Sequence, residues 1–424
     1  MTGAPPSPLI RRRRLIFSTL AFGYVLVYFH RLCTAVVAVD MMRDLHAGGE
    51  LIGFLSSAYF YPYALMQIPA GLLSDSWGPR RAIALFLLAA AGGSVILSLS
   101  TTPAWAVAGR ALVGLGVSTL FVCTLKILSE WYDAGEFAAM TGILMAVGGI
   151  GSLLAAAPLA FLTEWLGWRF SFLLMGGLTL LVALLVRLLV RDTPENPRPS
   201  GPWNPRVEPS AVISLTRGLR MVMAEPAFRP PAVWFFFTSA IYFSFIGLWG
   251  GPYLMHVYGL DKAGAGRILS LSAVGLIIGA PLLSRLSDRV FRRRKPVLIL
   301  SSLVAVFLTG LLTFATADLS RLLLGLICLG IGCATGAVVV VGFTVVKELF
   351  PKPIAGTATG FVNLFPFAGG ALFQPFLGYL LERGGKVGDA FTVAAYREAL
   401  AALFVSALLA CIAALFVKET MISR

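Results

Sequence analysis

The sequence has few charged residues, and this shortage is the first clue to where the chain lies. Only 13% of its 424 residues are charged, about half the share of a typical soluble domain. In contrast, 58% are hydrophobic, and the mean hydropathy is +0.85. Because so little charge is available to cover a water-facing surface, we expect most of the chain to lie in a lipid bilayer.

Side chains that carry enzymatic chemistry are scarce too. There are 3 histidines (His30, His46 and His256), and the 5 cysteines lie in apolar stretches without metal-ligand spacing. The sequence shows no paired carboxylates, no nucleophile elbow and no phosphate loop ending in Gly-Lys-Ser/Thr. We therefore predict neither an enzyme nor an ATP-driven pump, with no catalytic residue, no metal and no cofactor.

Basic residues outnumber acidic residues by 34 to 20, which gives a net charge of +14. They cluster at the ends of apolar runs, so lipid head groups and topology explain them better than a nucleic-acid partner does. With the N-terminus inside, roughly 22 of the 34 basic residues fall on the cytoplasmic side and roughly 8 on the other. This distribution predicts a plasma (inner) membrane protein of a prokaryote with both termini in the cytoplasm.

Apolar runs of about 20 residues, long enough to cross a bilayer, recur along the whole chain. Twelve spans are expected, at 15–39, 50–73, 82–101, 104–128, 138–162, 170–190, 231–256, 263–285, 296–315, 320–346, 355–381 and 396–417. We thus predict an all-α integral membrane protein with twelve transmembrane helices in two pseudo-symmetric six-helix bundles.

One long polar segment, rich in Pro and Arg, divides the chain into these two halves. The expected parts are a cytoplasmic tail (1–14), a first bundle (15–190), a cytoplasmic linker (191–230), a second bundle (231–417) and a final tail (418–424). Within the linker, residues 211–225 have the pattern of an interfacial amphipathic helix.

An internal repeat supports the division. The stretch GLLSDSWGPRRAI (71–83) recurs in distorted form as SRLSDRVFRRRKP (284–296), about 213 residues later. A second stretch, 130–151, can be aligned with 348–370 at an offset of about 218 residues. Two membrane bundles of common design are typical of secondary transporters, which bind substrate between the halves near mid-membrane.

The segment 71–83 resembles the loop between the second and third helices of the major facilitator superfamily, G-x-L-a-D-r-x-G-R-R/K. In that family the loop aspartate caps the eleventh helix across the two halves, and the loop arginines bind acidic helix ends. The resemblance therefore implies conformational gating rather than substrate contact for these positions. The gating candidates are Asp75, Arg80 and Arg81, with Asp288 and Arg293 in the second copy.

A charged residue in the middle of the first span is the main candidate for substrate binding. An ionisable group at that depth costs at least a few kcal/mol unless it faces protein or water, so Arg31 is a functional candidate. Tyr24, Tyr28 and Thr34 fall on much the same helical face. This stripe suits a carboxylate or phosphate held by charge-assisted hydrogen bonds. Alternatively, Arg31 pairs with a neighbouring helix and serves packing alone.

The segment YFHRLCTAVVAVDM resembles the first helix of the anion:cation symporter branch of the superfamily, which includes sialin-like, organophosphate, phthalate and sugar-acid transporters. The match lies at Tyr28 and Arg31, and in that branch the arginine binds the substrate anion. His30 stands where many members have a proton-coupling aspartate. A histidine can take over proton exchange near neutral pH, or it can simply donate a hydrogen bond.

Three further residues complete the predicted substrate-binding set. Arg110 begins a segment that resembles the fourth-helix R-x-x-x-G-x-G motif of the superfamily, which implies a role in anion binding, in proton coupling or in structure. Tyr242 lies in an aromatic stripe of the seventh span, and Asn363 is an amide within the eleventh. Both are candidates to line the pocket, although an aromatic stripe is more often a packing feature than a pocket lining.

Two functions compete on the same fold. We predict a monomeric secondary transporter that moves a small organic anion or carboxylate-bearing solute by alternating access, coupled to a proton or sodium ion. The alternative is an exporter of drugs, siderophores, amino acids or peptides. The fifth span lacks the G-P-x-x-G-G signature of drug antiporters, and no acidic residue lies clearly in mid-span to bind a cation. Both observations favour the anion transporter.

Overall fold

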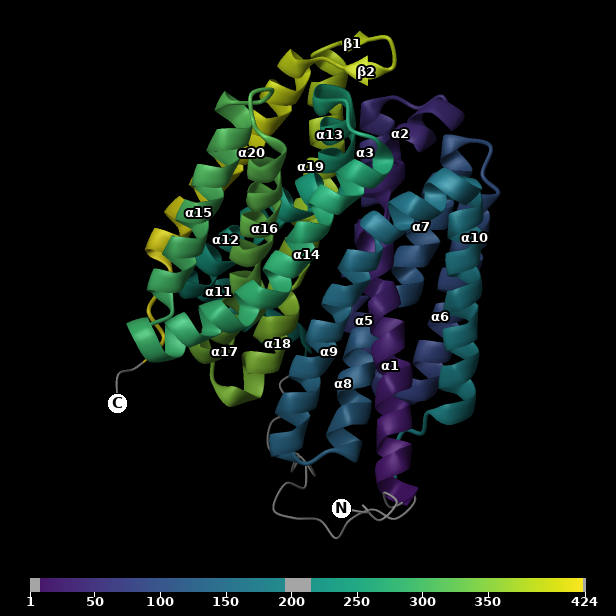
Figure 1. Ribbon diagram of the computed structural model, residues 1–424. Coiled ribbons are helices and arrows are strands. Elements are labelled where there is room, and N and C mark those ends of the chain that lie inside the picture. The colour runs from purple at the N-terminus through teal and green to yellow at the C-terminus, as the bar shows by residue number, and fades with distance from the viewer. Residues whose placement is uncertain (1–7, 195–214, 422–424) are drawn as a thin grey trace, which may run out of the picture.

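The computed structural model describes residues 8–194 and 215–421, and this part of the chain is almost wholly helical (Figure 1). The first half comprises α1 (Pro8–Leu32), α2 (Thr34–Asp44), α3 (Gly49–Ser57), α4 (Phe60–Leu65), α5 (Gln67–Ser76), α6 (Pro79–Ser98), α7 (Pro103–Val117), α8 (Leu120–Trp131), α9 (Ala134–Leu154) and α10 (Ala157–Leu189).

The second half begins after the linker. It comprises α11 (Leu215–Ala224), the 3-10 turn η1 (Pro226–Phe228), α12 (Arg229–Ile241), the π-helix η2 (Tyr242–Trp249), α13 (Gly250–Tyr258), α14 (Lys262–Arg285), the π-helix η3 (Leu286–Phe291), α15 (Lys295–Phe314), α16 (Arg321–Ala337), the π-helix η4 (Val338–Gly342), α17 (Phe343–Leu349), α18 (Lys352–Val362), α19 (Leu364–Arg383) and α20 (Val393–Phe416). A two-stranded hairpin, β1 (Lys386–Val387) and β2 (Ala390–Phe391), precedes α20.

Ten helical stretches of the described residues are long and apolar enough to cross a membrane. One of them, Ala139–Leu189, holds two spans, because Gly167 leaves the helical conformation (φ 73°) between the fifth and the sixth. The second span consists of α3, α4 and α5, which are individually too short to be counted. The twelve expected spans are therefore all present.

The two halves repeat each other at the level of backbone packing. A Cβ on Gly114 would lie 2.0 Å from the Tyr59 carbonyl oxygen, and a Cβ on Gly332 would lie 2.0 Å from the Ser272 carbonyl oxygen. In each half the fourth span thus touches the second at a glycine, which permits a close helix approach that any side chain would block.

The end of the molecule away from the termini is closed by contacts between the halves. Glu382 of α19 accepts a hydrogen bond from the backbone N–H of Gly49, which begins α3. Conversely, Glu164 of α10 accepts one from the backbone N–H of Ala263 in the first turn of α14, at 3.0 Å. Each half therefore caps a helix N-terminus of the other with a carboxylate, an arrangement that the helix dipole favours.

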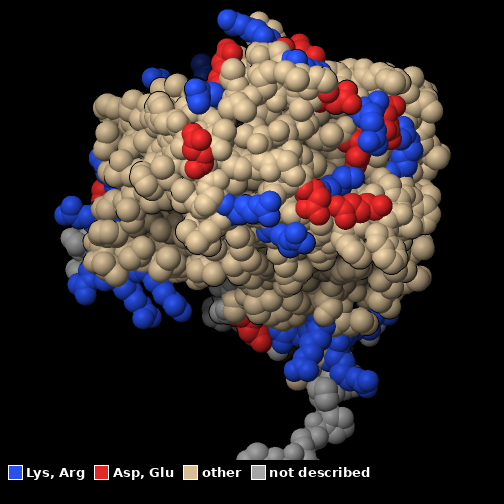
Figure 2. Space-filling model, turned by 45° about the horizontal axis from the view of Figure 1, so that its top comes forward, with Lys and Arg blue, Asp and Glu red and all other residues tan. Residues whose placement is uncertain are grey.

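An ion pair between Lys262 and Asp40 joins the halves at the same end. Figure 2 turns this end toward the viewer and shows acidic and basic side chains grouped on it, whereas mainly basic groups lie at the lower edge. Broad uncharged surface lies between these groups, as a bilayer requires.

The halves separate toward the end that carries the termini, where the lower parts of α8 and α9 diverge from α17 and α18 (Figure 1). Several glycines on this side of the interface helices meet no other atom within 4 Å of a built Cβ; they are Gly71, Gly142, Gly356 and Gly360. The described part of the chain is therefore closed on one side of the membrane and parted on the other.

Candidate substrate-binding site

Arg31 lies near the end of α1 and is only 7% exposed, yet no acidic side chain pairs with it among the described residues. Its Nε atom has no hydrogen-bond partner there. No Asp or Glu is buried anywhere in residues 8–194 and 215–421. The guanidinium thus remains an uncompensated positive charge inside the protein.

Aromatic rings from both halves surround this guanidinium. Its central carbon lies 4.8 Å from the ring centroid of Tyr28, 5.1 Å from that of Tyr63, 5.0 Å from that of Phe367 and 5.9 Å from that of Phe243. The tyrosines belong to the first half, and the phenylalanines come from η2 and α19 of the second. Arg31 therefore sits on the boundary between the halves, where cation–π contacts offset part of its desolvation.

Tyr24 extends the aromatic lining along α1. Its ring packs against Tyr28 with centroids 5.3 Å apart and stacks on Phe121 at 5.5 Å. Its hydroxyl donates to the Met145 sulfur at 3.5 Å. Tyr24 and Tyr28 also fill the space beside Gly148 of α9, so the predicted first-helix stripe faces α9 as well as Arg31.

Asn363 lies one helical turn before Phe367, toward the parted end of the molecule. Its Nδ2 donates to Oε1 of Gln67 at 3.2 Å, across the two halves. Gln67 in turn donates to the Tyr63 carbonyl oxygen at 3.1 Å. We call Arg31 and the four rings around it (Tyr28, Tyr63, Phe243 and Phe367) the Arg31 cluster. The Asn363–Gln67 pair lies between this cluster and the parted side of the molecule, so Asn363 borders the site and does not contact the guanidinium.

Arg110 is not part of the Arg31 cluster, although both were predicted to bind substrate. It is fully buried, and it donates to the carbonyl oxygens of His30 at 2.8 Å and Ser56 at 3.3 Å. It also contacts the Cys33 sulfur at 3.6 Å. Because α1 ends at Leu32 and α2 begins at Thr34, Arg110 braces the break in the first span.

His30 faces the interior of the first half. Thr179 of α10 donates its hydroxyl to the Met175 carbonyl oxygen at 2.7 Å, so it accepts from Nε2–H of His30 at 3.1 Å. The Nδ1 atom is then an acceptor, buried and without a partner among the described residues. The structure thus places the coupling candidate beside Thr179 and Arg110, not in the aromatic cluster.

The gating candidates of the first half lie at the parted end. Asp75 forms an ion pair with Lys126 of α8, within its own half. The backbone N–H of Arg80, at the start of α6, donates to Asp192 at 2.8 Å, and the Arg81 side chain is exposed. The ion-pair partner of Asp75 in this conformation is Lys126, and among the described residues no hydrogen bond joins Asp75 to the eleventh span, so its expected cap across the halves is not formed.

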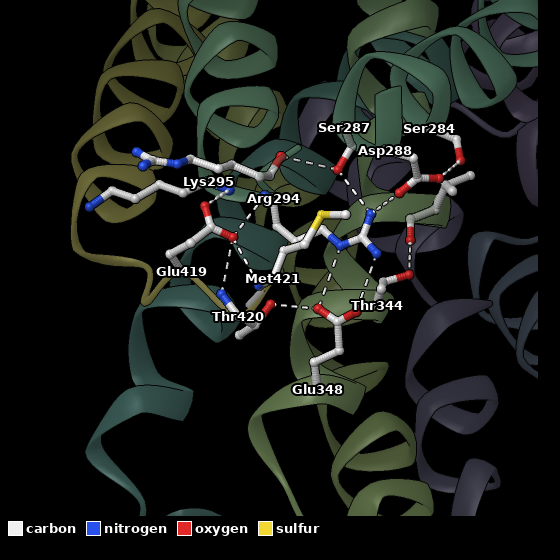
Figure 3. Close-up of polar contacts among 12 residues, drawn as sticks. Ser284, Ser287, Asp288, Arg294, Lys295, Thr344, Glu348, Glu419, Thr420 and Met421 are labelled. Atoms are coloured by element: carbon white, nitrogen blue, oxygen red, sulfur yellow. Dashed lines mark hydrogen bonds and ion pairs between the residues drawn. The ribbon is translucent and has the colours of Figure 1, made fainter. Parts of the chain in front are cut away.

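The second half contains a denser network at the corresponding place (Figure 3). Arg294 forms an ion pair with Asp288 and donates to Glu348 at 3.2 Å. Burial lowers the pKa of Arg294, but the carboxylates of Glu348 and Asp288 more than offset this effect and raise the pKa above its ordinary value. Arg293, the other gating candidate of this half, is exposed. Asp288 thus pairs with Arg294, the residue that follows Arg293.

A carboxylate from the C-terminal segment completes this network. Glu419 accepts from the backbone N–H groups of Arg294 at 2.9 Å and Lys295 at 3.1 Å, which begin α15. Burial raises the pKa of Glu419, but its four backbone N–H donors more than offset this effect and leave the pKa below its ordinary value. Asp192 makes the equivalent contact at the start of α6, so both halves use the carboxylate that follows their last span.

Sequence reasoning did not single out several residues of this region. Phe243 and Phe367 are 2 of 30 phenylalanines, and only the contact between halves distinguishes them. Ser152 carries a detectable signal, since it directly follows Gly151, which the internal repeat aligns with Gly369. Both glycines touch backbone of the adjacent first or seventh span. Ser152 could therefore have been assigned to the interface helices.

With this geometry established, comparison with known proteins identifies the class. The sequence model of the family described as "Major Facilitator Superfamily" matches residues 20–373 and 237–422 of this chain. The chain therefore belongs to the Major Facilitator Superfamily and is a membrane transporter with that family's twelve-span fold. This confirms the predicted family and fold class and the prediction that the protein is a transporter and not an enzyme.

Relatives of similar length cover nearly the whole chain. It is 23% identical to the "Probable sulfoacetate transporter SauU" of Cupriavidus necator, over 94% of this chain and 95% of that protein. It is also 23% identical to the "Probable galactarate/D-glucarate transporter GudP" of Escherichia coli, over 92% and 90%. The "Membrane sensor protein UhpC" of Salmonella typhimurium is 24% identical over 85% and 83%.

Solved structures share the fold. A bacterial homolog of the human lysosomal transporter Spinster, in an inward-facing and unoccupied conformation, superposes with a TM-score of 0.75 at 19% identity, covering 97% of both chains. A D-xylose-proton symporter superposes with a TM-score of 0.76 at 16% identity, covering 97% of this chain and 98% of that one. At these identities the likeness concerns the fold alone.

Proposed function

We propose that this transporter moves a small organic anion and binds the carboxylate of that anion at Arg31. The observation that carries the proposal is the burial of a permanent positive charge at the boundary of the halves without an acidic partner. Removing such a charge from water costs several kcal/mol, and aromatic rings return only part of this. A substrate anion would supply the missing partner through charge-assisted, bidentate hydrogen bonds.

The relatives support an anionic substrate. Two of them are named for sulfoacetate and for galactarate or D-glucarate, which are organic acids. The described residues include no buried Asp or Glu that would bind a cation. The exporter alternative therefore has no specific observation in its favour.

We further propose that the protein works as a monomer by alternating access in the inner membrane, with both termini in the cytoplasm. On this assignment the structure is the inward-facing state, since the halves separate toward the termini. Opening to the outside would break the two reciprocal caps at Gly49 and Ala263 and the Lys262–Asp40 ion pair. Transport would be coupled to a proton or sodium ion, and His30 is the proposed proton-coupling group.

Thermal unfolding of the detergent-purified protein tests the substrate class. The ligand panel should contain carboxylates, sulfonates, sugar phosphates, amino acids and lipophilic cations, because a ligand that binds the folded state raises the midpoint. We expect a carboxylate to raise it, and Arg31→Ala to abolish the response. Arg397→Ala, which removes an exposed arginine from α20, is the matched control and should respond like the parent protein.

Two results would contradict the proposal. If lipophilic cations alone raise the midpoint, and Arg31→Ala leaves that response intact, the exporter alternative takes its place. If an organic anion binds equally well to the Arg31→Ala protein, the substrate class stands but the site does not.

A further inference from the structure

Gln374 is an amide side chain that lies fully buried about midway along α19. Among the residues that the structure describes, no other Asn or Gln side chain is buried. An amide at this depth costs free energy unless it is hydrogen-bonded, so the partner of Gln374 indicates what the residue does.

The partner of Gln374 is the backbone of the π-helix η2. Its Nε2 donates to the Phe243 carbonyl oxygen at 2.9 Å. Its own backbone carbonyl accepts from Nε1 of Trp249, also at 2.9 Å. Phe243 is the second residue of η2 and Trp249 is the last, so a single residue of α19 bonds to both ends of this segment.

These two bonds bear on the form of η2. A π-helix pairs each backbone carbonyl with the N–H five residues later, one residue farther than an α-helix does. Such segments are rare and are frequent at functional sites. A return to α-helical pairing would rotate the side chains of η2 relative to α19, because the number of residues in each turn would change. The bonds from Gln374 therefore hold the side chains of η2 in the direction that the structure shows.

Phe243 is the residue of η2 that reaches the Arg31 cluster. Its ring centroid lies 5.9 Å from the central carbon of the Arg31 guanidinium, and its ring stacks on that of Phe367 with centroids 6.0 Å apart. The base of the ring rests on α19, since a Cβ on Gly370 would lie 3.0 Å from the Phe243 Cβ. Gly370 precedes Gln374 by one helical turn. The same face of α19 thus fixes the backbone of Phe243 and leaves room for its ring.

Gln374 also lies where the first half touches the second. Gly53 of α3 packs against the backbone of Gln374 and Pro375, and a Cβ on Gly53 would collide with the Gln374 carbonyl oxygen. This contact belongs to the closed side of the molecule, since α3 begins at the capped Gly49. The residue that fixes Phe243 is therefore itself held in place by the closure of the two halves.

We propose that Gln374 is a positioning residue for anion binding: it holds Phe243 over the Arg31 guanidinium through the backbone of η2. Phe243 then covers Arg31 from the second half and keeps water away, which strengthens the hydrogen bonds between the guanidinium and a bound carboxylate. Gln374 does not contact the anion. This inference rests on the proposed function, because it takes the carboxylate at Arg31 as given.

A double-mutant cycle tests whether Gln374 acts through the Phe243 ring. Binding of acetate, benzoate, succinate and D-gluconate is measured by calorimetry, and the acid that binds most tightly is used throughout. Gln374→Met keeps the length of the side chain and removes its donor, and it should weaken binding by about threefold to tenfold. Phe243→Ala should weaken binding at least as much. The double variant should bind no more weakly than Phe243→Ala alone, because the ring that Gln374 positions is gone.

Two further variants separate positioning from a general loss of packing. Gln374→Asn keeps the amide but is one methylene shorter, so it should show the same loss and replaces Gln374→Met if that variant does not fold. Ser302→Ala is the matched control, because it removes the acceptor of a buried bond, 2.8 Å long, from Nε1 of Trp234 in the same half. It should lower the unfolding midpoint and leave anion binding unchanged.

The outcomes distinguish this inference from the proposed function. If Arg31→Gln abolishes binding but both Gln374 variants bind like the parent protein, the proposed function stands and the role of Gln374 is wrong. The same holds if the losses of Gln374→Met and Phe243→Ala add up in the double variant, or if Ser302→Ala weakens binding as much as Gln374→Met does. If Arg31→Gln leaves binding unchanged, or no acid of the panel binds, both proposals fall.

Discussion

Arg31 and Arg110 are both arginines buried in the first half, but their surroundings differ completely. Arg110 donates to two backbone carbonyls and contacts a cysteine sulfur. Arg31 is surrounded by four aromatic rings, and the hydroxyls of Tyr59 and Tyr63 are its hydrogen-bond partners. The same side chain in the same bundle thus bonds once to backbone carbonyls at helix breaks and once lies among side chains at the boundary of the halves.

The difference shows how a guanidinium serves structure or binding. The partners of Arg110 belong to broken spans: His30 precedes the break between α1 and α2, and Ser56 precedes the break between α3 and α4. Carbonyls near a helix break lose helical partners, and a membrane offers no water to replace them. Arg110 supplies these bonds, whereas Arg31 faces rings of both halves and bonds to tyrosine hydroxyls rather than to backbone carbonyls.

The largest effect on stability is expected from substitution of Arg110, which bonds to backbone carbonyls. Arg110→Leu should lower the free energy of unfolding by about 3–5 kcal/mol, because it leaves two buried carbonyls unpaired and opens a cavity. Denaturant unfolding in detergent, followed by tryptophan fluorescence, measures the change. Arg31→Leu is the matched comparison and should be neutral or stabilising, since it removes an uncompensated charge. Equal losses in the two variants would show that Arg31 is structural as well.

The next effect concerns binding. Arg31→Gln should weaken binding of the carboxylate by about 100-fold or more, because two charge-assisted hydrogen bonds of about 1.5–3 kcal/mol each are lost. The unliganded protein should unfold at a midpoint no lower than before. Calorimetric titration gives the dissociation constant; a change of less than about threefold would mean that Arg31 does not bind the anion.

The sequence predicted the spans and Arg31 for one physical reason: a bilayer penalises charge and rewards apolar length, and both are visible residue by residue. It could not predict that Phe243 and Phe367 lie beside Arg31, because they come from η2 and α19, at least half the chain away. Nor could it separate Arg31 from Arg110. That distinction depends on which carbonyls the broken helices leave open.

In the second half Asp288 pairs with Arg294, one residue after the gating candidate Arg293, for a local reason. Sequence spacing aligned Arg80 with Arg293, but the second copy has Phe291 in place of the loop glycine Gly78. Gly78 takes a positive φ of 85°, whereas in the second copy Arg292 takes the left-handed conformation (φ 50°) after the π-helix η3. The shift presents Arg294 to Asp288 and leaves Arg293 exposed.

Arg294 differs from Arg110 in the chemistry of its partners. The carboxylates of Asp288 and Glu348 beside Arg294 can take up a proton, whereas the backbone carbonyls bonded to Arg110 cannot. Glu419, which caps the same helix start, has a pKa below its ordinary value when folded, so the unfolded state binds more protons. Its stabilisation is complete above the ordinary Glu pKa of about 4.3 and is lost as pH falls through the folded value. Glu419→Gln should flatten this part of the stability–pH curve measured by thermal unfolding.

The control for that measurement is Arg110→Leu, which should lower the whole curve without changing its slope between about pH 3 and pH 5, since carbonyl partners do not titrate there. Because Glu419 is only partly buried and lies near the surface, we expect a change of less than about 1 kcal/mol. An unchanged slope in Glu419→Gln would mean that the cap does not depend on the charge of the carboxylate.

The smallest effect is expected at Tyr59, whose ring lies 5.2 Å from the Arg110 guanidinium and stacks on Tyr63 of the Arg31 cluster. Tyr59→Phe keeps the ring and removes a hydroxyl that donates a long bond, 3.4 Å, to the Val27 carbonyl oxygen and accepts a hydrogen bond from the Arg31 side chain. Stability should change by less than about 0.5 kcal/mol. Anion binding should change by less than about threefold.

Tyr59→Leu is the informative partner of that variant, because it also removes the ring that lies over the Arg110 guanidinium. It should cost Arg110 its cation–π contact and lower the free energy of unfolding by about 2–4 kcal/mol, in part through the cavity. Its effect on anion binding should stay several-fold smaller than that of Arg31→Gln, because Tyr28, Tyr63, Phe243 and Phe367 remain around Arg31. If Tyr59→Leu abolished binding but left stability unchanged, Tyr59 would belong to the binding site and the division between the two arginines would have to be redrawn.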